Sequence, residues 1–180
     1  MSGGAHIDPS NKKVALLISI LALLLAISEM LGKSAQTQAI SQNIEASNLW
    51  SFYQAKTIRM TTLRASADGM ESIGKPNDKQ IKLIEKWRDD AKRYDTEPET
   101  GEGRKELMAR AKQAEGRRDL AMSAHHQYEL ASALVQIGIV LASTSIIVAI
   151  PALVWVGAGL GVLGTVFVGI GYLAPTLIHF

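Results

Sequence analysis

Long apolar runs and one long charged segment alternate along this chain. Val14 to Leu31 is an apolar run in which Glu29 is the single charged residue. Leu130 to Leu173 contains no Asp, Glu, Lys or Arg at all. A helix that crosses a bilayer needs about 20 apolar residues, with a lower limit of roughly 17. The first run therefore predicts a transmembrane helix over 14–31, preceded by a tail over 1–13.

The second run is too long for one span. As a single helix it would extend about 66 Å at 1.5 Å per residue, more than twice the roughly 30 Å of the hydrocarbon core. Pro151 is the natural break, because proline lacks a backbone donor and disfavours helix at the preceding residue. We therefore expect transmembrane helices over 130–150 and 151–173, followed by a tail over 174–180.

Lys12 and Lys13 precede the first run, and a basic flank before an apolar run is also typical of a secretory signal peptide. No clean A-x-A cleavage site follows the run. We therefore favour a retained membrane anchor over a cleaved signal.

Residues 32–129 form the charged segment and are predicted to fold as helices outside the membrane. A stripe with alternating steps of four and three residues indicates a coiled-coil-like helix face; it comprises Ala35, Ala39, Gln42, Ala46, Leu49, Tyr53, Lys56, Met60, Leu63 and Ala67. Without a proline between 14 and 69, the first span is expected to continue into this stripe as one helix. A shorter helix over 78–94, capped by Asn77 or Asp78, an acidic loop over 95–103, and a helix from Arg104 into the second span complete the prediction. The expected fold is all-α: three transmembrane helices and an extramembrane antiparallel helical bundle or coiled-coil hairpin.

The average composition conceals this division. The chain has 180 residues, 47% hydrophobic and 20% charged, which would suit one soluble domain. However, 17 of the 19 basic and 15 of the 17 acidic residues lie within 32–129. The net charge of this segment is therefore only +2, which is too balanced for a nucleic-acid-binding surface. The absence of cysteine excludes disulfides, thiolate metal sites and cysteine nucleophiles.

One segment after the first span has a distinctive sequence: Ala46-Ser-Asn-Leu-Trp-Ser-Phe-Tyr-Gln-Ala-Lys-Thr-Ile-Arg59. It resembles a bacterial domain-of-unknown-function family of small three-span membrane proteins, in which a tryptophan, an aromatic pair and Gln-Ala-Lys-Ser/Thr-Ile follow the first span. Gln136 to Ser143 in the second span is also similar. The resemblance implies the three-span architecture and no chemistry. This chain departs from the family in the turn around Pro151, which lacks basic residues.

Basic residues near the first span set the expected orientation. Lys12 and Lys13 favour a cytoplasmic N-terminus, whereas Arg117 and Arg118 before the second span oppose it. Long segments translocate largely regardless of charge. We therefore expect a multi-pass protein of the bacterial inner membrane with its central segment in the periplasm.

Four glycines give the clearest interaction signal: Gly157, Gly161, Gly164 and Gly171 share one face of the third span. Small residues let helix backbones approach closely in lipid. The spacing does not decide between packing within the chain and association between chains.

Two polar residues lie within the expected spans. Glu29 is an ion-path candidate, although Lys33 four residues later is expected to pair with it at the interface. Gln136 is expected to hydrogen-bond to another helix, with a polar transport path as the alternative.

The aromatic segment supplies the last set of candidates: Trp50, Phe52, Tyr53, Gln54 and Lys56. They form either a partner surface or the core where the long helix meets Trp87 and Tyr94. His125, His126 and Glu129 are too few for a metal site without another ligand.

No phosphate-binding loop, catalytic triad or paired-carboxylate motif occurs, so we assign no catalytic, metal or cofactor residue. The leading hypothesis is a non-enzymatic protein that assembles in the lipid bilayer as a homo-oligomer or with other subunits of a membrane complex. The alternative is a homo-oligomeric channel or transporter. A third possibility is an enzyme whose site forms between chains.

Overall fold

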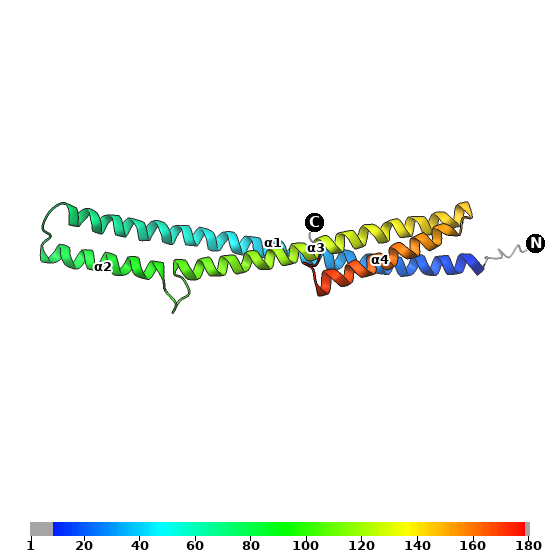
Figure 1. The fold of residues 1–180 in the computed structure, drawn as a ribbon, viewed down its shortest axis with the longest axis horizontal. Coiled ribbons are helices and arrows are strands. Elements are labelled where there is room, and N and C mark those ends of the chain that lie inside the picture. Colours follow the sequence, from blue (N-terminus) through cyan, green and yellow to red (C-terminus); the bar gives the residue numbers. More distant parts are fainter. Residues whose placement is uncertain (1–8, 179–180) are drawn as a thin grey trace, which may run out of the picture. The chain divides into compact units, whose positions relative to one another are not determined.

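The computed structural model describes residues 9–178, and within that range the chain forms four helices and no strand. The helices are α1 (Pro9–Ser72), α2 (Asp78–Asp95), α3 (Arg104–Val148) and α4 (Ala152–Leu173) (Figure 1). The predicted all-α class is therefore confirmed for the described residues. Of these helices, α1, α3 and α4 are each long and apolar enough to cross a membrane.

The helix ends follow from local chemistry. Asn77 caps α2: its side chain accepts hydrogen bonds from the backbone N–H groups of Lys79 and Gln80, while the Gln80 side chain accepts from the Asn77 N–H at 2.8 Å. This reciprocal capping box satisfies donors that the first turn of a helix leaves free. At the other predicted break, α3 ends at Val148 and Ala149 adopts a left-handed conformation with φ of 55°. The chain thus reverses before Pro151, as expected from the sequence.

The chain divides into two compact units. Unit 1 contains α1 up to Ala39, α3 from Asp119 onward, and α4; unit 2 contains residues 40–118. Unit 2 lies within the charged segment of residues 32–129. Residues 32–39 and 119–129 belong to unit 1, where the Gly32 carbonyl lies 3.0 Å from Nδ1 of His125.

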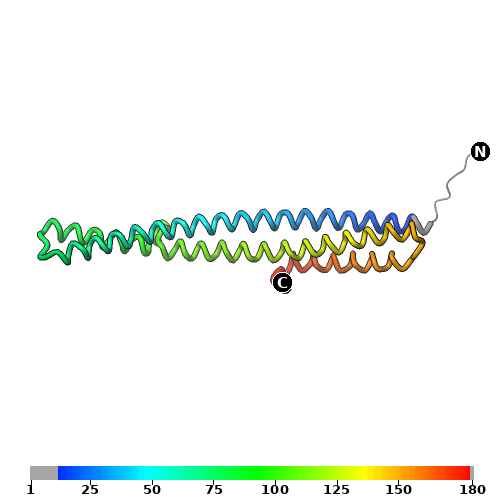
Figure 2. The backbone as a smooth tube through the Cα atoms, turned by 90° about the horizontal axis from the view of Figure 1, so that it is seen from above, coloured from blue at the N-terminus to red at the C-terminus, as the bar shows by residue number. Residues whose placement is uncertain are grey.

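In unit 1, α4 lies beside the C-terminal part of α3 (Figure 2). The four glycines of the third predicted span, Gly157, Gly161, Gly164 and Gly171, are all buried. Each faces another helix of the same chain. A Cβ atom added to Gly157 would lie 2.7 Å from the Gly138 carbonyl oxygen of α3, and one added to Gly161 would overlap Leu21 of α1.

The other two glycines meet α3 in the same way. Added Cβ atoms would lie 2.6 Å from Cγ2 of Val135 at Gly164 and 2.8 Å from Cε1 of Tyr128 at Gly171. Real Cβ atoms essentially never approach so closely, so a larger residue at either position would force Val135 or Tyr128 to shift. The glycine face therefore packs within the chain in this structure.

In unit 2, α2 and the first part of α3 lie along α1 (Figures 1 and 2). The predicted α1 stripe from Gln42 to Ala67 faces inward, because each of its positions in this unit is buried or half-buried. The core consists mainly of small residues and contains Ala46, Leu49, Leu107, Ala111 and Ala114, with Trp50 and Tyr53 packed against it. Alanine at these positions allows the helices to lie close together.

The close approach of α3 and α4 gives a direct test. We predict that Gly157→Ala destabilises the full-length chain by about 1–3 kcal/mol, the usual cost of overpacking, because the added methyl group meets the Gly138 carbonyl. The matched control is Gly159→Ala on the same helix, where nothing lies within 4 Å of an added Cβ. Thermal unfolding in mild detergent measures both; equal midpoints for the two variants would contradict the packing described.

Candidate functional site

The aromatic segment of α1 forms the most connected polar cluster of unit 2. Lys56 is only 6% exposed. Its Nζ atom lies 3.6 Å from Oε2 of Glu97 and 3.8 Å from Oε2 of Glu102. Both carboxylates belong to the loop between α2 and α3, so the Lys56 ammonium holds this loop against α1.

Aromatic rings complete the surroundings of this cation. The Nζ atom lies 5.4 Å from the ring centroid of Phe52 and 5.1 Å from that of Tyr94. A cation within about 6 Å of a ring face is attracted by the ring quadrupole. Two carboxylates and two rings thus compensate Lys56 for the water it has lost.

Arg104, the first residue of α3, makes the second set of contacts. Its guanidinium donates to the Tyr53 hydroxyl at 3.0 Å and to Oδ1 of Asp95 at 3.2 Å. It also lies over the Tyr53 ring, 5.1 Å from the centroid. A planar guanidinium can satisfy several acceptors at once, so Arg104 links the end of α2 and the start of α3 to α1.

Trp50 makes a third link between the same helices. Its indole Nε1 donates to Oε1 of Glu115 on α3 at 2.8 Å, and its ring meets the Tyr53 ring edge-to-face at 5.4 Å. Four of the five candidates in this segment, Trp50, Phe52, Tyr53 and Lys56, thus make contacts inside unit 2. Phe52 is 38% exposed, and Gln54 is exposed.

A second stripe of α1 was not recognised in the sequence. It lies opposite the buried face, and all its positions are exposed and uncharged; this outer stripe consists of Ile40, Ile44, Ser47, Ser51, Ala55, Ile58 and Thr62. The three isoleucines are 54%, 56% and 66% exposed. Hydroxyl groups in the stripe bond within the helix, as Ser51 does to the Ser47 carbonyl. The positions of this outer stripe are separated by steps of four and three residues, as in the buried stripe. This periodicity is the sequence signal that predicts it.

The polar candidates of unit 1 meet each other. Nε2 of Gln136 on α3 donates to Oε1 of Glu29 on α1 at 3.3 Å, and both residues are exposed. The expected pairing of Glu29 with Lys33 is absent among the ion pairs of the described residues. The neighbouring helix offers Glu29 an amide donor that was not visible from local spacing.

Other polar side chains of the predicted spans bond within their own helix. Ser143 donates to the Ile139 carbonyl at 2.8 Å, and Ser145 donates to the Ala142 carbonyl at 2.7 Å. These hydroxyls are satisfied without water or a partner helix. They differ in this respect from Gln136, which reaches another helix.

The histidines before the second predicted span form weak contacts with one carboxylate. Oε2 of Glu129 lies 3.8 Å from Nε2 of His125 and 3.7 Å from Nδ1 of His126. The described residues contain no group of three or more acidic, His or Cys side chains suited to a metal ion. Burial raises the pKa of the nearby Tyr128 hydroxyl above its ordinary value of 10.0, with a further increase from Tyr172. Tyr128 therefore stays neutral at physiological pH.

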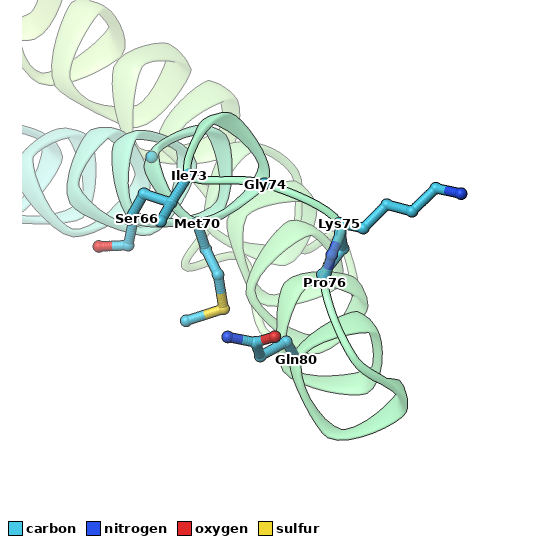
Figure 3. A pocket seen from close by; sticks show the side chains of 8 residues that line it. Ser66, Met70, Ile73, Gly74, Lys75, Pro76 and Gln80 are labelled. Carbon is cyan, nitrogen blue, oxygen red and sulfur yellow. The ribbon is translucent and has the colours of Figure 1, made fainter.

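A hollow of about 440 Å³ lies where α1 turns into α2 (Figure 3). Met70 and Gln80 line it from the two helices, and Ile73 at the turn is 88% exposed. Gly74 has φ of 148°, which side chains rarely allow. This hollow contains no cluster of catalytic side chains.

Comparison with known proteins shows the family of the chain. A family model described as a domain of unknown function (DUF4337) matches residues 10–174. The chain therefore belongs to this family. No curated protein and no solved structure matches the chain.

The cluster around Lys56 predicts a specific effect on the loop between α2 and α3. Lys56→Met keeps most of the side-chain length and removes the charge, so Glu97 and Glu102 lose their ion pairs with this residue and Glu97 keeps only the pair with Arg93. We expect backbone amides of residues 95–103 to exchange with solvent roughly tenfold faster, corresponding to a loss of about 1–2 kcal/mol. Hydrogen exchange of the full-length chain in detergent measures this.

The matched control is Lys82→Met, which removes a charge from an exposed position of α2. Exposed substitutions of this kind usually change stability by less than about 0.5 kcal/mol. If loop exchange is the same in both variants, Lys56 does not hold the loop.

Proposed function

We propose that this member of the DUF4337 family is a multi-pass protein of the bacterial inner membrane that acts without catalysis, by assembly. It forms a homo-oligomer or serves as an accessory subunit of a larger membrane complex. The apolar parts of α1, α3 and α4 cross the bilayer, and unit 2 lies outside it. The lengths and compositions of these helices support this arrangement.

The outer stripe of α1 is the observation that carries the proposal. Unit 2 buries alanines such as Ala46 and Ala67, whereas Ile40, Ile44 and Ile58 remain exposed. Burying an aliphatic side chain of this size at an interface stabilises the complex by about 1.5–3 kcal/mol. A row of such side chains on one helix face, with no charge among them, suits a helix of a partner that supplies an apolar stripe of its own.

The polar groups in and around the aromatic segment of α1 support assembly over catalysis. Lys56 and Arg104 are both engaged by carboxylates and aromatic rings inside unit 2. These contacts fix the hairpin of α1, α2 and α3 as a rigid unit. A rigid helical unit is well suited to present one face to a partner, because little conformational entropy is lost on binding.

A paired-charge variant tests the outer stripe. Ile44→Glu combined with Ile58→Glu places two carboxylates in the stripe and should reduce the assembled fraction at least about tenfold, because burying unpaired charges opposes association. The matched control combines Asn48→Glu and Gln54→Glu, two exposed positions of α1 beside the stripe. Glutamate is a good helix former, so none of the four substitutions is expected to break α1.

Native mass spectrometry of the chain purified from membranes in mild detergent gives the readout. The unmodified chain and the control should appear in a complex heavier than one 19.4 kDa chain, and the stripe variant mainly as the single chain. A single unaccompanied chain in every sample would refute assembly. Retention of the complex by the stripe variant would refute the outer stripe as its surface.

The orientation can be tested separately because the chain has no cysteine. We place the N-terminus in the cytoplasm, since Lys12 and Lys13 precede the first span, and unit 2 in the periplasm. A cysteine introduced by Glu99→Cys, at an exposed loop position, should react with a membrane-impermeant maleimide in intact spheroplasts. A cysteine introduced by Ser2→Cys should react only after lysis. The reverse pattern would overturn the orientation.

A further inference from the structure

Two adjacent hollows mark one face of unit 1. The first, of about 430 Å³, lies along α1 and α3; its lining includes Glu29, Lys33, Glu129, Ala133 and Gln136. The second, of about 460 Å³, is lined by His126, Glu129, Leu130 and Ala133. Glu129 and Ala133 line both hollows, so this part of α3 forms a ridge between them. We call this surface the ridge face.

The ridge face lies on the side of α3 that α4 leaves uncovered. Packing within unit 1 uses one row of α3, which is buried: Ala131, Val135, Gly138 and Ala142. The ridge follows a second row with the same spacing, which is exposed: Glu129, Ala133, Gln136 and Val140. Steps of four, three and four residues are typical of a helix-packing seam, so α3 carries one occupied seam and one open seam.

The open seam carries polar groups that a lipid-facing surface disfavours. Glu29 is exposed and receives one hydrogen bond, from Gln136. The next residues in sequence, Met30 and Ile137, are 65% and 53% exposed. A carboxylate has about four acceptor sites, and charged groups within a bilayer are usually paired with another protein group. The Glu29 carboxylate therefore has unused acceptors near the end of the first span.

Membrane insertion restricts which partner can supply the missing donors. Copies of a spanning protein that share one orientation are related by rotation about the membrane normal, so groups meet at equal depth. At the depth of Glu29 each copy also presents the amide of Gln136, its hydrogen-bond partner. A Cβ atom added to Gly32 would lie 3.4 Å from Cβ of Tyr128, so Lys33 and Glu129, the next residues in sequence, lie within one helical turn of each other in depth. At each of these two depths, every copy therefore presents both a hydrogen-bond donor and a carboxylate acceptor.

We infer that the ridge face binds a second copy of this chain in the same orientation. Ala133 at the centre of the seam lets the two α3 helices approach closely, while Gln136 and Lys33 of one copy face the carboxylates of Glu29 and Glu129 in the other. An isologous interface of this kind is self-complementary because the same patch occurs on both subunits. The inference rests on the proposed assembly function, names a second copy of the chain as the partner, and adds a second surface, in unit 1, to the outer stripe of unit 2.

Disulfide crosslinking of the full-length chain in its membrane tests the inference. Ala133→Cys should give a covalent dimer on mild oxidation. Val166→Cys, at a 51% exposed position on the outer side of α4, is the control and should remain monomeric. In the Ala133→Cys background, adding Gln136→Leu should reduce dimer formation about threefold to tenfold, as expected for one interhelical hydrogen bond in lipid. Adding Ile137→Leu instead should leave the yield unchanged.

The outcomes separate this inference from the proposed function. A dimer from Ala133→Cys, none from Val166→Cys, and a lower yield with Gln136→Leu support the ridge face. Crosslinking at Val166 alone, or a complex that contains one copy with other proteins, overturns the ridge face and leaves assembly standing. A single chain with no crosslink and no bound protein overturns both.

Discussion

The close packing of small residues is the constraint on which both units depend. Helix interfaces in unit 1 are built on glycine, as where Gly138 and Gly157 cross with no room for a Cβ atom on either. In unit 2 the buried positions are largely alanine, with Ala46, Ala111 and Ala114 in one core cluster. Small side chains bring helix backbones together, so that many weak dispersion contacts stabilise the interfaces in place of large buried side chains.

Interiors built from small residues leave the larger aliphatic side chains outside. In unit 1 this suits helices that can cross a bilayer, because lipid solvates exposed leucine and isoleucine. In unit 2, which contains the charged loops, the same distribution leaves an uncharged stripe on α1 with Ile44 and Ile58 exposed. The Lys56 and Arg104 contacts lie on the buried face of α1, opposite this stripe. The outer stripe is the face of α1 that remains exposed.

Much of the fold could be predicted from the sequence because its signals are local. Asn77 starts α2 through its own side chain, and Pro151 breaks the long apolar run by lacking a backbone donor. The partners of polar side chains could not be predicted in this way. Local spacing suggested Lys33 as the partner of Glu29, whereas the structure pairs Glu29 with Gln136, which is distant in sequence. The periodicity of α1 likewise placed Lys56 on an inward stripe without revealing that Glu97 and Glu102 meet it there.

Counting the copies of the chain in its own membrane tests the central claim of assembly most directly. The full-length chain, labelled with one fluorophore per copy, can be extracted with its surrounding lipid into native nanodiscs and bleached one molecule at a time. Assembly through the ridge face predicts two or more bleaching steps in most nanodiscs. Single-step bleaching, in nanodiscs that contain no other protein, would contradict assembly as the function of this chain.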